Sequence, residues 1–150
     1  MPLDAAHIHL MLNHVPVIAA PLLLLVLTIG LLRGSGELVT VSLVLVVGLA
    51  LATGLVYLTG EPAEELVEHA PWFREALVEP HEEHAAISLG AVLVTGVLAA
   101  VALVRRRRAG LWPRLVWAGL LVSTALLGWT AWSGGQIRHD EVRPAAVGLS

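Results

Sequence analysis

Four long stretches of this chain contain no Asp, Glu, Lys or Arg, and they limit what it can fold into. They cover residues 5–32, 38–59, 85–104 and 115–135. A helix needs about 20 residues to cross the roughly 30 Å hydrocarbon core of a bilayer, and each stretch reaches that length. Leu, Val and Ala run through them without alternating with polar residues, which favours helices over barrel strands. We therefore predict an all-α membrane protein with four transmembrane helices.

The composition excludes several other classes of protein. Only 14% of the residues are charged, against about 25% in ordinary soluble domains. The absence of Cys excludes disulfide scaffolds, thiolate zinc sites and iron–sulfur clusters. A net charge of -3 argues against nucleic-acid binding. The first apolar stretch is too long for a signal peptide and no positive charge precedes it, so we expect it to remain as a membrane helix.

The arginines predict the orientation in the membrane. Six of them flank the short first and third connections: Arg33, Arg105, Arg106, Arg107, Arg108 and Arg114. The positive-inside rule places these connections in the cytoplasm. Short connections favour antiparallel neighbours, so we expect one domain over residues 1–150 with an up-down-up-down bundle. Both termini, the loop 60–84 and the tail 136–150 would then face outward from a bacterial inner membrane.

The outer loop, residues 60–84, is patterned for short amphipathic helices. Four glutamates recur on one helical face: Glu61, Glu64, Glu65 and Glu68. Pro62 suits the first turn of that helix, and Pro71 can open a second short helix at the membrane interface. We expect Pro80 to start the third membrane helix. We also expect Gly134-Gly135 to end the fourth, so that the tail folds back across the mouth of the bundle.

The ionisable residues gather on the predicted outer side, which is the most informative feature for function. All seven histidines lie there: His7, His9, His14, His69, His81, His84 and His139. So do all the acidic residues except Glu37. Imidazole and carboxylate groups together ligate iron and zinc, and copper where imidazole predominates. We therefore expect a transition-metal site that caps the bundle. Its candidate ligands are His14, Glu61, Glu64, Glu65, His81, Glu82, His139 and Glu141.

His14 is the histidine most strongly expected to have a function. It lies inside an apolar stretch, and ionisable residues in membrane helices usually face the bundle interior. His7 shares its helical face but stands about 10 Å away along the axis, so one ion cannot bind both. Met11 lies between them on that face, whereas His9 points elsewhere and is expected to make an interfacial hydrogen bond.

Two other functions stay open at this stage. A b-type haem could take His14 and His84, or His14 and His81, as axial ligands from antiparallel helices and transfer electrons. Alternatively, the chain is a structural or accessory subunit whose polar mouth docks a periplasmic partner, redox or otherwise. A first helix kinked at Pro16 and Pro21 would leave a gap for a small ligand or quinone. The sequence establishes no reaction and leaves self-association open.

The chain also resembles small four-span bacterial inner-membrane proteins that form a domain-of-unknown-function family. The resemblance rests on four short motifs along the chain: His14-Val15-Pro16, Thr59-Gly60-Glu61-Pro62, His81-Glu82-Glu83-His84 and Gly134-Gly135-Gln136-Ile137-Arg138-His139. It implies the four-helix fold and an association with redox chemistry or metal, without an assigned reaction. On the family pattern, His14 and either His81 or His84 form the functional pair.

Overall fold

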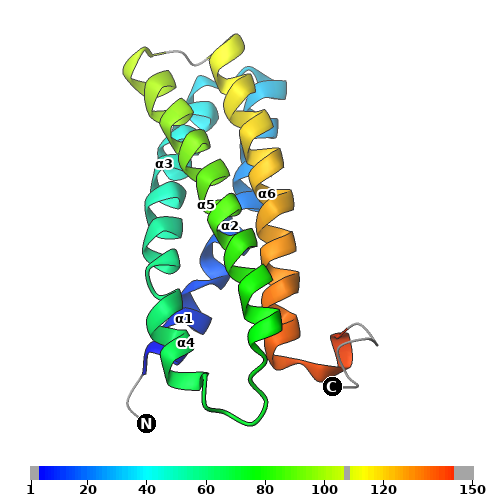
Figure 1. Ribbon diagram of the computed structural model, residues 1–150. Helices are drawn as coiled ribbons and strands as arrows, with labels where there is room; N and C mark the ends of the chain where they lie inside the picture. The colour runs from blue at the N-terminus through cyan, green and yellow to red at the C-terminus, as the bar shows by residue number, and fades with distance from the viewer. Residues whose placement is uncertain (1–3, 107–108, 144–150) are drawn as a thin grey trace.

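The computed structural model describes residues 4–106 and 109–143, and these residues form helices and no strands (Figure 1). Four helical segments are long and apolar enough to cross a membrane, so the predicted all-α fold with four membrane-length helices is confirmed. The helices are α1 Ala5–Leu12, α2 His14–Arg33, α3 Gly36–Tyr57, α4 Gly60–Val67, α5 Glu75–Val104 and α6 Leu111–Arg138, followed by a 3-10 turn at Asp140–Val142. Arg107, Arg108 and residues 144–150 of the expected tail lie outside the described residues.

The four long helices form a bundle in which each packs against two neighbours, in the order α2, α3, α5, α6 and back to α2. The connections α2–α3 and α5–α6 lie at one end, which we call the arginine end (Figure 1). Gly34 ends α2 with φ 62°, and its N–H reaches the carbonyls of Gly30 and Leu31, a left-handed cap that glycine adopts without strain. Helices α1 and α4 lie at the opposite end, which we call the histidine end.

The bundle has an apolar core and an apolar outer surface. Leu27, Leu43 and Leu120 are fully buried between the helices. Large apolar side chains are also exposed along every long helix, such as Leu51 at 68% and Leu25 at 56%. Water would disfavour such a surface, so the helices have the surface expected for contact with lipid.

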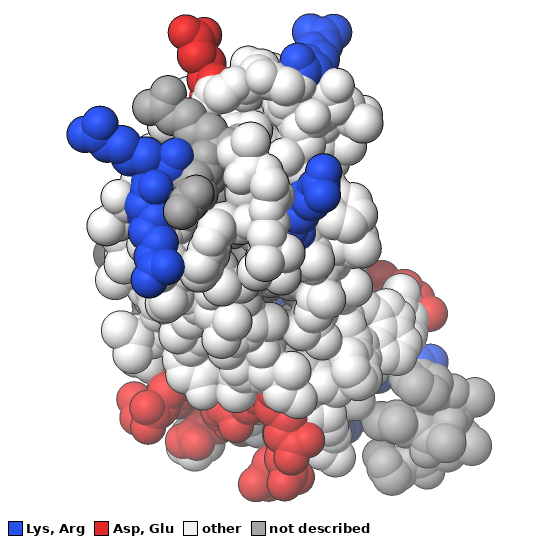
Figure 2. Space-filling model, turned by 90° about the horizontal axis from the view of Figure 1, so that it is seen from above, with Lys and Arg blue, Asp and Glu red and all other residues white. Residues whose placement is uncertain are grey.

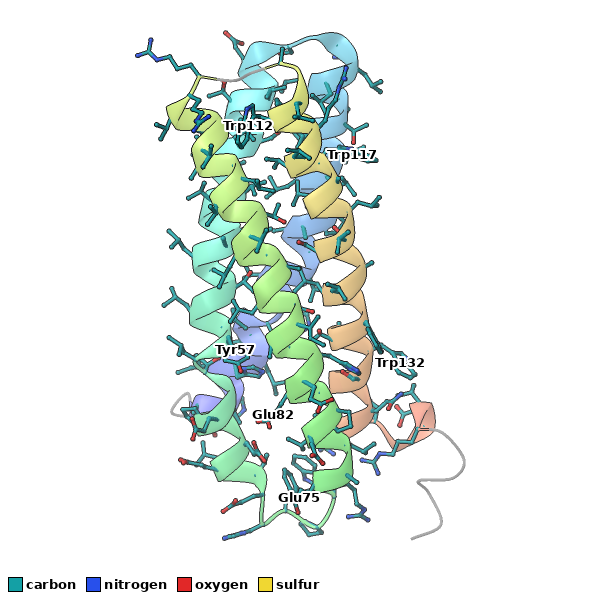
Figure 3. All side chains as sticks on the ribbon, turned by 45° about the horizontal axis from the view of Figure 1, so that its top comes forward. Tyr57, Glu75, Glu82, Trp112, Trp117 and Trp132 are labelled. Atoms are coloured by element: carbon teal, nitrogen blue, oxygen red, sulfur yellow. The ribbon has the colours of Figure 1, made fainter. Side chains whose placement is uncertain are left out.

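Aromatic side chains mark both ends of the bundle, as Figure 3 shows for Trp112 and Trp117 at the arginine end and Trp132 toward the other. The Trp117 Nε1–H donates to Thr28 Oγ1 at 2.8 Å, which joins α6 to α2. The Arg105 guanidinium lies 5.4 Å from the centre of the Trp112 ring. Aromatic rings at two levels of a helical bundle are typical of the two membrane–water interfaces.

Two of the membrane-length segments are broken near the histidine end. α1 ends at Leu12 and α2 starts at His14, because Pro16 has no N–H to donate to the carbonyl four residues earlier. The second break separates α3 from α4 at Leu58–Thr59. Beyond these breaks α1 and α4 pack against each other, and we call this pair the α1–α4 arm. The first turns of α5 and the last turns of α6 form the facing α5–α6 arm.

Three expectations about local structure are wrong. Pro71 does not open a separate short helix, and Pro80 does not start the third membrane helix, because α5 begins at Glu75 and passes through Pro80. Pro80 lies past the first turn of α5, and its missing N–H leaves the Ala76 carbonyl without its helical hydrogen bond. Gly134-Gly135 do not break α6, which continues to Arg138. Arg143 then donates to the Gln136 and Ile137 carbonyls, both at 2.8 Å, and so caps the end of α6.

Candidate functional site

Charge is divided between the two ends of the bundle. Figure 2 looks down on the arginine end, where basic side chains stand out from a mostly uncharged surface and acidic side chains show mainly at the lower edge. Apart from Glu37, the described acidic residues are Asp4, which precedes α1, and those in α4, in α5, in the loop between these helices and in the tail after α6. The polar side chains that could bind a ligand or an ion therefore lie mainly at the histidine end.

The described histidines divide into two groups. His9, His81 and His84 are partly buried between helices, whereas the other four are exposed on the surface. The exposed group consists of His7, His14, His69 and His139. Only the partly buried group can contribute to a site inside the histidine end.

His81 and His84 are held against α6. His81 Nδ1 lies 3.1 Å from the Thr130 carbonyl oxygen. Ser133 Oγ lies 3.2 Å from His81 Nδ1 and also 3.2 Å from His84 Nδ1. The His84 ring also stacks against Trp129, with ring centroids 4.0 Å apart. Since a carbonyl only accepts, His81 donates from Nδ1. A neutral His81 therefore carries its lone pair on Nε2, the atom that most often binds a metal.

His9 is held in the same way on the opposite arm. Its Nδ1 lies 2.9 Å from Thr59 Oγ1, and the Thr59 hydroxyl donates its own hydrogen to the Val56 carbonyl at 2.6 Å. Thr59 Oγ1 must then accept from His9 Nδ1, which leaves the lone pair on His9 Nε2. His9 and His81 are close enough to interact electrostatically. Two imidazoles with lone pairs on Nε2 are therefore held at the histidine end, one on each arm and within electrostatic range of each other.

A pair of carboxyl groups also links the arms. Glu64 of α4 and Glu82 of α5 are close enough to interact electrostatically, and Glu82 also interacts electrostatically with His81. Figure 3 shows Glu82 on the side of α5 toward α4. Two ionised carboxylates repel each other, so a proton or a cation between them would relieve the repulsion.

His14 differs most from its predicted position. Its side chain is exposed, and its Nδ1 lies 2.7 Å from the Leu10 carbonyl. The buried positions of α2 are Pro16, Ala20, Leu23, Leu27 and Gly30, and a residue two positions before Pro16 faces the opposite way at 3.6 residues per turn. The expectation that His14 faces the bundle interior is therefore wrong.

The other predicted ligands are not gathered into one cluster. His139 pairs with Glu141 at 3.0 Å in the exposed tail, and Glu61 and Glu65 are exposed on α4. Within residues 4–106 and 109–143, no three His, Asp or Glu side chains are placed so that they could hold one ion. Of the eight expected ligands, Glu64 interacts electrostatically with Glu82, and Glu82 with His81, but these three are not placed to hold one ion. Metal binding by the full predicted set stays a prediction.

His9 is the functional candidate that the sequence patterns did not single out. The buried face of α2 can be followed backward from Ala20 through Pro16 and Asn13 to His9 in steps of three and four residues. Residues at this spacing lie on one face of a helix. The spacing therefore places His9 on the buried face and is a signal in the sequence that could have identified it as inward-facing.

Comparison with protein-family models, curated proteins and solved structures gives no match. The resemblance to a four-span family therefore stays an expectation from short motifs, and the function has to be argued from the geometry of the histidine end.

Proposed function

We propose that the chain is a multi-pass protein of the bacterial inner membrane, an up-down-up-down bundle whose histidine end and both termini face the periplasm. The arginines at the opposite end support this orientation, because short connections rich in Arg stay in the cytoplasm. The described members are Arg33, Arg105, Arg106 and Arg114.

Single-cysteine labelling tests this orientation, because the chain has no native Cys. A membrane-impermeant maleimide applied to intact cells should label His69→Cys in the α4–α5 loop, where the His69 side chain is 93% exposed. The same reagent should label Ala109→Cys, in the α5–α6 connection, only after the inner membrane is permeabilised. If Ala109→Cys were labelled in intact cells while His69→Cys was protected, the protein would have the opposite orientation and the proposal would be wrong.

We further propose that the histidine end binds a transition metal. Binding would draw together His9 and His81 as imidazole ligands and Glu64 and Glu82 as carboxylate ligands, which are not placed to hold one ion beforehand. The observation that carries the proposal is that both imidazoles are anchored through Nδ1, which leaves Nε2 free to bind. Histidine ligands usually have this arrangement, with the second nitrogen hydrogen-bonded to a carbonyl or another fixed group. A cation would also relieve the repulsion between the two carboxylates. This donor set favours iron or zinc over cuprous copper.

A b-type haem is the second candidate function, and one observation favours it. Bis-histidine ligation needs two imidazoles from different helices, and His9 on α1 and His81 on α5 meet that requirement. The paired carboxyl groups of Glu64 and Glu82 have no role in this alternative. Redox activity with a periplasmic electron donor would follow from either a haem or an iron centre.

Elemental analysis and a visible spectrum of the same detergent-purified sample test these proposals. The metal-centre proposal predicts iron or zinc near one atom per chain and no Soret band. A Soret band with stoichiometric iron would support haem b and contradict a non-haem centre. Absence of both signals, in protein purified without chelator and after incubation with either metal, would contradict both and favour docking of a periplasmic partner by the acidic end.

Gly134 offers a test that leaves every proposed ligand in place. A Cβ on Gly134 would lie 2.9 Å from His81 Cε1, whereas a Cβ on the adjacent Gly135 would meet no atom within 4 Å. Gly134→Ala should displace the His81 ring and weaken zinc binding by about tenfold, as the loss of a positioning contact typically does. Gly135→Ala is the matched control and should bind like the unmodified protein. Equal affinity in the two variants, measured by competition titration, would exclude His81 as a ligand.

A further inference from the structure

We propose that a second metal site, selective for cuprous copper, lies on the outward face of α1 and the first turn of α2, where His7, Met11 and His14 supply the ligands. The site is separate from the proposed iron or zinc centre and does not depend on it. His14 thereby has a chemical role even though it does not face the bundle interior.

The three side chains share one helical face. They are four and three residues apart, which places successive members one turn above each other. The helix changes little at the α1–α2 break, because Asn13 keeps right-handed helical angles, with φ -63° and ψ -24°. All three side chains are exposed, and Met11 is 64% exposed although it is a large apolar residue. No other described side chain covers this face. Because Ala5–Arg33 has 29 residues and about 20 suffice to cross the hydrocarbon core, its first turns can extend beyond that core toward water.

Both imidazoles are already oriented for metal binding. Asp4 Oδ1 accepts from His7 Nδ1 at 2.8 Å and from the His7 backbone N–H at 2.9 Å. The Leu10 carbonyl accepts from His14 Nδ1 at 2.7 Å. Each ring thus has its Nε2 free of partners among the described residues.

The donor set is what gives the site its selectivity. Thioether sulfur is a soft ligand that favours cuprous copper, whereas the usual protein ligands of zinc are Cys, His, Asp and Glu. His7 and His14 are about 10 Å apart along the axis, so one ion cannot bind both rings. The Met11 thioether must therefore bind together with one imidazole at a time, as either a His7–Met11 or a Met11–His14 pair. Met11 is common to both pairs, and each histidine belongs to one.

This shared arrangement predicts a distinctive pattern in a cuprous-copper titration. Protein in detergent would be titrated without oxygen, with ascorbate and a coloured cuprous chelator as competitor. Met11→Leu should weaken binding by about tenfold or more, because both pairs lose their sulfur. His7→Ala or His14→Ala alone should weaken it only about twofold, the statistical loss of one of two pairs. The double variant His7→Ala/His14→Ala should be as weak as Met11→Leu.

Controls separate this site from the proposed iron or zinc centre. His9→Ala should bind cuprous copper like the unmodified protein, and Met11→Leu should bind zinc unchanged. Leucine keeps the size of Met11, so folding should be preserved, and thermal unfolding of each variant checks this. Cuprous binding that is unchanged in Met11→Leu would overturn the proposal. Equal loss in Met11→Leu and His9→Ala would also overturn it, because copper would then bind at the other centre.

Discussion

His81→Ala is expected to lower iron or zinc binding at the histidine end by at least about tenfold, because it removes a ligand whose orientation is already fixed. His81 Nδ1 is held by the Thr130 carbonyl at 3.1 Å, and its ring lies against the backbone at Gly134. The ring therefore has one preferred position before any ion arrives. His9→Ala should have an effect of similar size, because His9 is held in the same way by Thr59.

His14→Ala is the informative control for this experiment. The sequence predicts the same role for His14 and His81, and the structure separates them by placing His14 on the outer surface. His14→Ala should therefore retain zinc while His81→Ala loses it. Zinc affinity would be measured by competition with a fluorescent chelator, and helix content and thermal unfolding would check the fold of each variant. Equal loss in both variants would contradict the ligand assignment made from the structure.

Gly96→Val is expected to reduce the free energy of unfolding by about 1–3 kcal/mol, the usual cost of forcing extra atoms into a packed contact. A Cβ on Gly96 would lie 2.5 Å from Ala50 Cβ, so α5 would have to move away from α3. Close approach of membrane helices at small residues is a main source of their packing energy. Moving α5 away from α3 would therefore also weaken the contacts of neighbouring side chains.

Gly48→Val in α3 is the matched control for Gly96→Val. A Cβ at Gly48 would meet no atom within 4 Å, and valine changes the intrinsic helix preference by the same amount at both positions. The difference between the two variants therefore isolates the clash between α3 and α5. Unfolding in mixed micelles, followed by circular dichroism, measures both. Equal stability of the two variants would contradict the close α3–α5 contact.

The membrane helices could be predicted because an apolar run of about 20 residues without a charge matches the thickness of a bilayer. Their ends near the histidine end were harder to predict, since proline and glycine are only local signals. Pro80 and Gly134 were expected to interrupt helices, but both lie inside them. Packing of α5 on α6 and the cap from Arg143 outweigh these costs, which are about 3 kcal/mol for a proline inside a helix and about 1 kcal/mol for a glycine.

The sequence predicts that histidine and glutamate gather at one end, but it does not predict which of them lie close together, and a binding site there stays a prediction. The excess of histidine and glutamate on one side is visible in the sequence, whereas helix rotation decides which of them meet. His14 and His9 are only five residues apart, yet one is exposed and the other is held against Thr59. The contact of Glu64 with Glu82 joins two helices whose relative placement no local pattern specifies.

X-ray absorption at the zinc edge of the zinc-loaded protein tests the proposed centre most directly. The proposal predicts a first shell of nitrogen and oxygen at about 2.0–2.2 Å, with scattering from two imidazole rings and no sulfur. In the His81→Ala variant, the scattering from one of the two imidazole rings should be absent from the spectrum. A shell of oxygen alone, or an unchanged two-imidazole signal in His81→Ala, would contradict the account.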